Sequence, residues 1–144
     1  MAEDGSYRAG TVASSTILVA ELQAIYEAIR TSAASSRLRI LSDSKPALHL
    51  IDETLRIGVI RNRSGVRGAK DTALVLHRIA VQTARRQVRF EWVKGHSSNT
   101  LNDAADRLAF QARRCAQLGG DPARLGVIYD RIVSESLAHL AKKP

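Results

Sequence analysis

Cysteine is almost absent from this sequence, long apolar runs are missing, and acidic residues are the minority charge. The single cysteine, Cys115, excludes an internal disulfide and a metal cage built from cysteines, and its apolar helical surroundings indicate a plain core residue. No apolar run approaches the length that spans a bilayer, so we expect no membrane association. The opening residues, MAEDGSYRAG, lack the apolar stretch of a secretory signal, and we expect a cytoplasmic protein.

What is present is the composition of one soluble globular domain with an excess of positive charge. The 144 residues suit a single domain, and 44% of them are hydrophobic and 25% charged. Twenty-two Lys and Arg residues against 14 Asp and Glu give a formal net charge of +8. Positive charge favours polyanionic partners through phosphate contacts and counterion release. Nucleic acid is therefore the favoured partner class, although charge alone identifies no activity.

Hydrophobic spacing predicts an alternation of strands and helices. Apolar residues at helical spacing predict a helix over residues 16–30, and a short buried run predicts a strand over 38–41. The other predicted elements are helices at about 44–55, 71–85, 101–117 and 121–142, a strand at 87–93, and a short strand at 7–13 after a turn at Asp4-Gly5. Strands that alternate with helices indicate a sheet with helices packed against it, an α/β fold.

A basic segment that contains glycine follows the second predicted helix. Its cations are Arg56, Arg61, Arg63, Arg67 and Lys70, and the pattern predicts a loop. Two interpretations remain open, namely a loop that grips nucleic acid and a loop that is only solvated.

Three acidic residues occupy positions where acids are unexpected. Glu21 borders the apolar stripe of its predicted helix, where a carboxylate needs a metal or a partner such as an arginine. Asp43 directly follows a predicted strand, at the end where α/β sheets place ligands, or else it caps the next helix. Asp106 lies one turn after Asn102, near the apolar edge of its helix, where a salt bridge is the alternative role.

Carboxylates gathered at one point suit hard divalent cations. Two such ions can activate a water and stabilise the leaving oxygen in phosphodiester cleavage, so these acids imply magnesium. His96 lies in a predicted loop six residues before Asn102, from which an imidazole can transfer a proton, although a solvated histidine is the alternative. The other histidines, His49, His77 and His139, form no usable pattern.

Three segments, taken in order, resemble motifs of the type 1 ribonuclease H family. They are AELQAI at 20–25, LSDSKPAL at 41–48 and EWVKGHSSNTLNDAADRLA at 91–109. The third is the most specific, because a strand ending in Trp-Val-Lys-Gly-His precedes a loop, an Asn and an Asp four residues later. The resemblance implies a ribonuclease H-like mixed sheet flanked by helices, truncated at its N-terminal end and followed by an extra C-terminal helix. We expect this domain over residues 1–117 and a helical extension over 118–144.

The resemblance also implies an activity, the hydrolysis of the RNA strand in RNA:DNA hybrids, with duplex shape and the 2′-hydroxyl defining the substrate. The family's metal-binding acids carry over to Glu21, Asp43 and Asp106, with two Mg²⁺ or Mn²⁺ ions as cofactors. His96 matches the family's loop histidine. The implied nucleic-acid contacts are Thr16, Lys94, Asn102, Arg61, Arg63 and Arg67.

The resemblance departs at the beginning of the chain. Family members carry two strands before the one predicted at 7–13, and the first of them holds another catalytic Asp. Only 17 positions separate Asp4 from Glu21, too few for those strands, so we interpret Asp4-Gly5 as a turn. The chain is then a fragment, is inactive, or pairs with a second copy or another partner chain at an exposed sheet edge. The alternative function is a noncatalytic module that binds nucleic acid or a protein.

Overall fold

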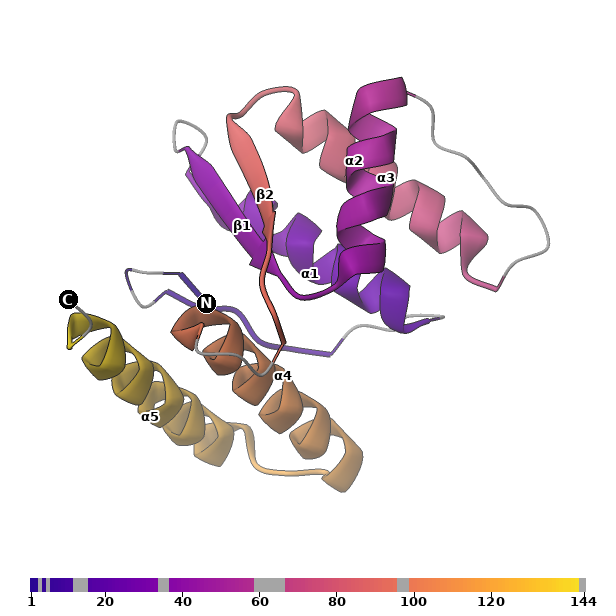
Figure 1. The fold of residues 1–144 in the computed structure, drawn as a ribbon. Helices are drawn as coiled ribbons and strands as arrows, with labels where there is room; N and C mark the ends of the chain where they lie inside the picture. The colour runs from indigo at the N-terminus through magenta and orange to yellow at the C-terminus, as the bar shows by residue number, and fades with distance from the viewer. Residues whose placement is uncertain are drawn as a thin grey trace. The chain divides into compact units, whose positions relative to one another are not determined.

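A computed structural model describes residues 1–2, 4, 6–11, 16–33, 37–58, 67–95 and 99–142. The elements in chain order are α1 (Ile17–Thr31), β1 (Leu38–Ser42), α2 (Lys45–Ile57), α3 (Ala69–Thr83), β2 (Val88–Trp92), α4 (Thr100–Leu118) and α5 (Pro122–Ala141) (Figure 1). They fall into two compact units. The central unit comprises Val12–Trp92, and the terminal unit comprises Met1–Thr11 with Val93–Pro144. None of the described helices combines the length and apolar content that a membrane crossing requires.

The sheet of the central unit is a parallel pair of strands. β1 and β2 run side by side, with Leu38 beside Val88 at one end and Ser42 beside Trp92 at the other (Figure 1). Alternate side chains of a strand point to opposite faces. On one face Ile40 and its neighbours pack against the core that α1, α2 and α3 build. This sheet with helices on it confirms the predicted α/β fold, and within the described residues its strands are parallel.

The opposite face of this strand pair carries charge. Glu91 forms ion pairs with two arginines, with Arg39 Nε 3.3 Å from Oε2 and Arg89 Nε 3.0 Å from Oε1. Arg39 and Arg89 are direct cross-strand neighbours, so Glu91 offsets the repulsion between them. The two faces of the sheet thus differ sharply in polarity.

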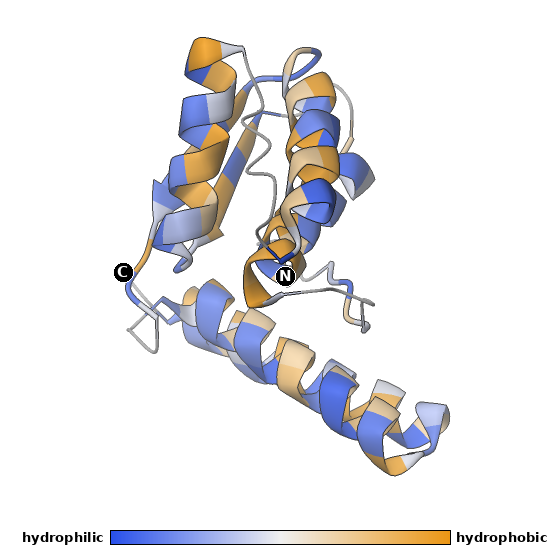
Figure 2. Cartoon of the chain, turned by 90° about the vertical axis from the view of Figure 1, so that its right-hand side faces the viewer, coloured by the Kyte–Doolittle hydropathy of each residue, from blue (hydrophilic) through white to orange (hydrophobic). Residues whose placement is uncertain are grey.

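The core of the central unit is aliphatic and tightly closed. Leu22 and Ile29 from α1 are completely buried, and Ile51 from α2 and Ile79 from α3 retain only 1% exposure. Burying such a side chain stabilises a fold by roughly 1.5–3 kcal/mol. Each helix carries hydrophobic and hydrophilic residues on different sides, as expected for helices that cover a core (Figure 2).

The terminal unit is built on an antiparallel pair of helices. α4 ends at Gly119, which adopts a left-handed conformation at φ 64°, and Asp121 caps α5 by accepting from the Ala123 backbone N–H at 3.0 Å. Leu108 of α4 and Ile132 of α5 belong to the apolar cluster between the two helices. These details confirm the predicted end of one helix and start of the next.

Two predictions about local structure were wrong. Residues 7–11 are irregular rather than a strand, and residues 12–13 lie outside the described part. Their alternating pattern has another cause, because Tyr7 and Ala9 pack against the α4–α5 cluster while Arg8 and Gly10 are exposed. The basic loop is also shorter than predicted, since Arg56 lies in the last turn of α2 and Lys70 in the first turn of α3.

Candidate functional site

The turn between β1 and α2 presents Asp43. Ser44 is the N-cap of α2, where its hydroxyl oxygen accepts from the Ala47 backbone N–H at 3.4 Å. The buried Ser42 hydroxyl accepts from the Ser44 backbone N–H at 3.2 Å. Serines on both sides therefore hold the backbone, and the alternative role of Asp43 as helix cap is wrong. Among the described residues, no hydrogen bond or ion pair engages the half-buried Asp43 carboxylate.

The main-chain carbonyl of Asp43, by contrast, is held from two directions. It accepts from the Lys45 backbone N–H at 3.0 Å and from the Trp92 indole N–H at 3.2 Å. The Lys45 ammonium lies 4.3 Å from the centroid of the Trp92 ring, within the range of a cation–π interaction. Sequence reasoning missed this contact, although Trp92 ends the strand of the most specific motif and Lys45 stands two residues after Asp43.

Glu21 lies on α1 of the same central unit. It is half-buried and flanked by the buried Leu22, as its position beside the apolar stripe predicted. Its side chain or backbone also has an interaction partner. Thr16 proves to be the N-cap of α1, with its hydroxyl oxygen accepting from the Val19 backbone N–H at 3.2 Å. This capping role of Thr16 was not recognised from the sequence.

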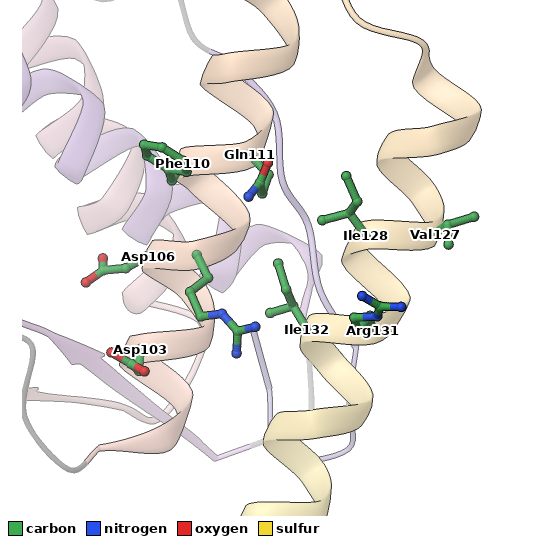
Figure 3. Close-up of a pocket in the computed structure, with 9 residues that line it drawn as sticks. Asp103, Asp106, Phe110, Gln111, Val127, Ile128, Arg131 and Ile132 are labelled. Carbon is green, nitrogen blue, oxygen red and sulfur yellow. The ribbon is translucent and has the colours of Figure 1, made fainter.

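Asp106 belongs to the terminal unit and lies on α4. It is half-buried, and it too has an interaction partner. A groove of about 480 Å³ runs along α4 and α5, and Asp103, Asp106 and Phe110 are among the residues that line it. In Figure 3, Asp106 extends from the side of α4 away from α5, whereas Ile132 extends from α5 toward α4.

The groove mixes charged and apolar surface. Arg107 of α4 forms an ion pair with Glu135 of α5, with Nη2 2.7 Å from Oε2. Phe110 and Val127 remain 48% and 68% exposed in this unit. Asp103 is exposed.

The predicted nucleic-acid contacts are distributed over both units. Lys94 is exposed just after β2, and Asn102 is half-buried in the first turn of α4, where its backbone N–H donates to the Asn99 side chain at 3.1 Å. Arg67 is exposed before α3. His96, Arg61 and Arg63 lie outside the described residues.

The three candidate acids carry the donor atoms of a divalent-cation site. Carboxylate oxygens are the ligands that Mg²⁺ and Mn²⁺ prefer, so the chemistry of Glu21, Asp43 and Asp106 fits. In the part of the chain that the structure describes, no three His, Cys, Asp or Glu side chains form a group able to hold a metal. Glu21 and Asp43 belong to one unit and Asp106 to the other.

Asp4 lies in a turn, as predicted. Its side chain accepts from the Ser6 backbone N–H at 2.8 Å, and the Ala2 backbone N–H donates to the Ser6 carbonyl at 2.8 Å. Hydrogen bonding by Ser6 holds the pKa of the exposed Asp4 carboxyl below its ordinary value. Cys115 is half-buried rather than a core residue, and its thiol donates to the Gly120 carbonyl at 3.3 Å.

Comparisons with known proteins point to one family. The sequence profile of RNase H matches residues 2–114. Ribonuclease HI of Rickettsia prowazekii (strain Madrid E) is 34% identical over 98 residues, which cover 67% of this chain and 64% of that protein. Ribonuclease H of Rickettsia typhi (strain ATCC VR-144 / Wilmington) is 33% identical over the same coverage, and that of Methylorubrum extorquens (strain PA1) is 29% identical, covering 69% of this chain and 43% of the relative.

The chain spans somewhat less than two thirds of the length of the Rickettsia relatives that it matches. No solved structure matches it significantly.

Proposed function

The chain belongs to the RNase H family, and we propose that it hydrolyses the RNA strand of RNA:DNA hybrids in a reaction that depends on divalent metal ions. The observation that carries the proposal is that the Asp43 carboxylate takes no part in capping α2. Ser44 caps α2 and Ser42 secures the turn, so the Asp43 carboxylate is left for a ligand at the carboxyl end of β1.

We propose Glu21, Asp43 and Asp106 as the metal-binding acids. The ions would be Mg²⁺, or Mn²⁺ in its place, and when bound they would supply a Lewis acid for the water and for the leaving oxygen. The donors come from three elements, α1, the β1–α2 turn and α4. Glu21 and Asp106 are half-buried, a setting in which a carboxylate binds a cation with less competition from water.

The remaining residues are assigned to the substrate. His96 is proposed to move a proton during hydrolysis or product release. Thr16, Lys94, Asn102, Arg61, Arg63 and Arg67 are proposed to contact the hybrid, and the net charge of +8 supports phosphate contacts. We expect discrimination by duplex shape and the 2′-hydroxyl rather than by base sequence. A cytoplasmic location remains a prediction.

The test is cleavage of end-labelled RNA annealed to DNA, with Mg²⁺ or Mn²⁺ present. Asp43→Asn is expected to abolish cleavage that the unaltered chain performs. Asp52→Asn is the matched control, because it replaces the same carboxylate with the same amide at an exposed position of α2. Equal activity in all three proteins would contradict the assignment of Asp43, and absence of cleavage in all three would contradict the activity.

The second candidate is a noncatalytic module that binds nucleic acid or a protein partner. The observation that favours it is the turn at Asp4, where the carboxylate accepts from the Ser6 backbone N–H. The same assay distinguishes the two functions. Retention of the hybrid without metal-dependent cleavage would select the binding module. Association with a second copy or a partner chain at the sheet edge remains part of this alternative.

A further inference from the structure

The Trp92 side chain is in an unusual position for the only tryptophan of the chain. It is 48% exposed at the end of β2, although the preceding residues of the same face, Val88 and Phe90, pack against the core. Filling the core therefore does not account for it. Its indole N–H instead reaches the Asp43 carbonyl, which comes 49 positions earlier in the sequence.

We infer that Trp92 is a positioning residue for Asp43, with Lys45 holding the indole in place, and this inference rests on the proposed function. The strand register places Trp92 directly beside Ser42, the residue before Asp43. The indole N–H then ties the next peptide of the β1–α2 turn to β2 at 3.2 Å.

Lys45 completes the arrangement from the other side of the turn. Its backbone N–H donates to the same Asp43 carbonyl at 3.0 Å, and its ammonium covers the Trp92 ring at 4.3 Å. A cation over an aromatic face contributes about 0.5–1 kcal/mol at an exposed site. The ring is thus kept in the orientation that its hydrogen bond requires.

The consequence concerns the freedom of the Asp43 backbone. A carboxylate that binds a metal or a reacting group must be held within a fraction of an ångström of its working position by the groups around it. The peptide link between Asp43 and Ser44 is held at both of its polar atoms, because its N–H donates to the Ser42 hydroxyl and its carbonyl accepts from the Trp92 indole on β2. Trp92 therefore acts on the reaction through Asp43 without contacting the substrate itself.

The decisive variant is Trp92→Phe, which removes the N–H donor and keeps a ring under Lys45. The probe is Mn²⁺ alone. Its binding is measured by the broadening of the backbone amide NMR signals of Ser42 and Asp43. We expect the apparent Mn²⁺ affinity to fall about fivefold, and kcat for hybrid cleavage to fall by roughly five- to tenfold with little change in KM. Val88→Ala, at the far end of β2, is the control for a general loss of stability.

A second variant keeps the test decisive if Trp92→Phe does not fold. Lys45→Met retains the aliphatic stem and removes the cation, and it is expected to speed hydrogen exchange of the Trp92 indole N–H by about two- to threefold, because the ring is held less firmly against Asp43. Unchanged Mn²⁺ affinity and kcat in a folded Trp92→Phe would overturn the inference. If Lys45→Met must stand in for that variant, an unchanged exchange rate of the indole N–H would overturn it. Mn²⁺ that leaves the Asp43 signal of the unaltered chain unbroadened would overturn it as well. A chain that never cleaves hybrids but loses Mn²⁺ affinity in Trp92→Phe would refute the proposed function and uphold the positioning role.

Discussion

Tyr7 meets Tyr129 edge to face, with ring centroids 5.5 Å apart and an interplanar angle of 75°. The Tyr7 hydroxyl also donates to Asp130 Oδ1 at 3.3 Å, so two contacts join the first residues of the chain to α5. Such an aromatic pair contributes about 0.5–1.5 kcal/mol beyond the area that it buries.

Replacement of Tyr7 should separate these contributions. Tyr7→Ala is expected to lower the free energy of unfolding by about 1–3 kcal/mol, because the ring contact and its burial are lost. Tyr7→Phe should cost about 0.5 kcal/mol, since only an exposed hydrogen bond disappears. Urea denaturation measures both. Equal stability of Tyr7→Ala and the unaltered chain would show that the N-terminal contact does not stabilise the terminal unit.

The same two tyrosines predict a loss of stability at alkaline pH. Burial is the first cause that raises the pKa of both phenols, and the Asp130 charge adds to the effect at Tyr7. A raised pKa in the folded state gives stability that is present below the unfolded-state value of about 10 and is lost as pH rises through the folded-state pKa. Denaturation at about pH 8 and pH 11 should therefore show lower stability at the higher value.

Lysines titrate in the same range, so the control for this prediction is a variant with Tyr7→Phe and Tyr129→Phe. It should lose less stability between the two pH values than the unaltered chain does. An identical loss in both proteins would assign the pH dependence to other groups.

Thr16 has a structural role that can be measured apart from its proposed contact with the hybrid. Because its hydroxyl caps α1, Thr16→Ala is expected to lower the free energy of unfolding by about 1 kcal/mol, whereas Thr16→Ser keeps the cap. Thermal denaturation compares the two variants. If Thr16→Ala weakens hybrid binding without lowering stability, the hydroxyl serves the substrate and the cap is dispensable.

The acids of α4 should differ in their importance for cleavage. Asp106→Asn is expected to reduce hybrid cleavage about a hundredfold or more, because a carboxylate that binds a catalytic metal supports several kcal/mol of transition-state stabilisation. Asp103→Asn is its matched control on the same helix and the same groove, and it should change the rate less than about twofold. Rates under saturating Mg²⁺ provide the comparison. Similar losses in both variants would argue for a general electrostatic effect of this face.

The helices of this protein could be predicted closely from the sequence because each carries a local signal. Apolar spacing predicted a helix over residues 16–30, and α1 runs from Ile17 to Thr31. The helix predicted at about 121–142 is α5, which begins at Pro122 after its cap Asp121. At residues 7–11, the alternation of side chains along the sequence did not distinguish a strand from an irregular segment. The alternation there is real, but it arises from contact with Tyr129 and its neighbours, more than a hundred positions away.

The candidate site was predictable to the level of residue types and less so for their surroundings. Asp43 stood out because it follows a buried strand, and the structure removed its alternative role by giving the cap to Ser44. The link from Trp92 to that turn could not be deduced, because it depends on the register of two strands far apart in the sequence. A local pattern carries no information about such a register.

The position of Tyr7 has a consequence for how the chain is made. Tyr7 leaves the ribosome 123 residues before Asp130, with which it pairs in the folded chain. The Arg107–Glu135 pair spans 28 positions, so α4 and α5 can meet soon after both exist, whereas contacts across long separations form slowly. The segment around Tyr7 thus has no partner until α5 has been made, and the apolar surface of α4 that it covers stays open to chaperones in the meantime.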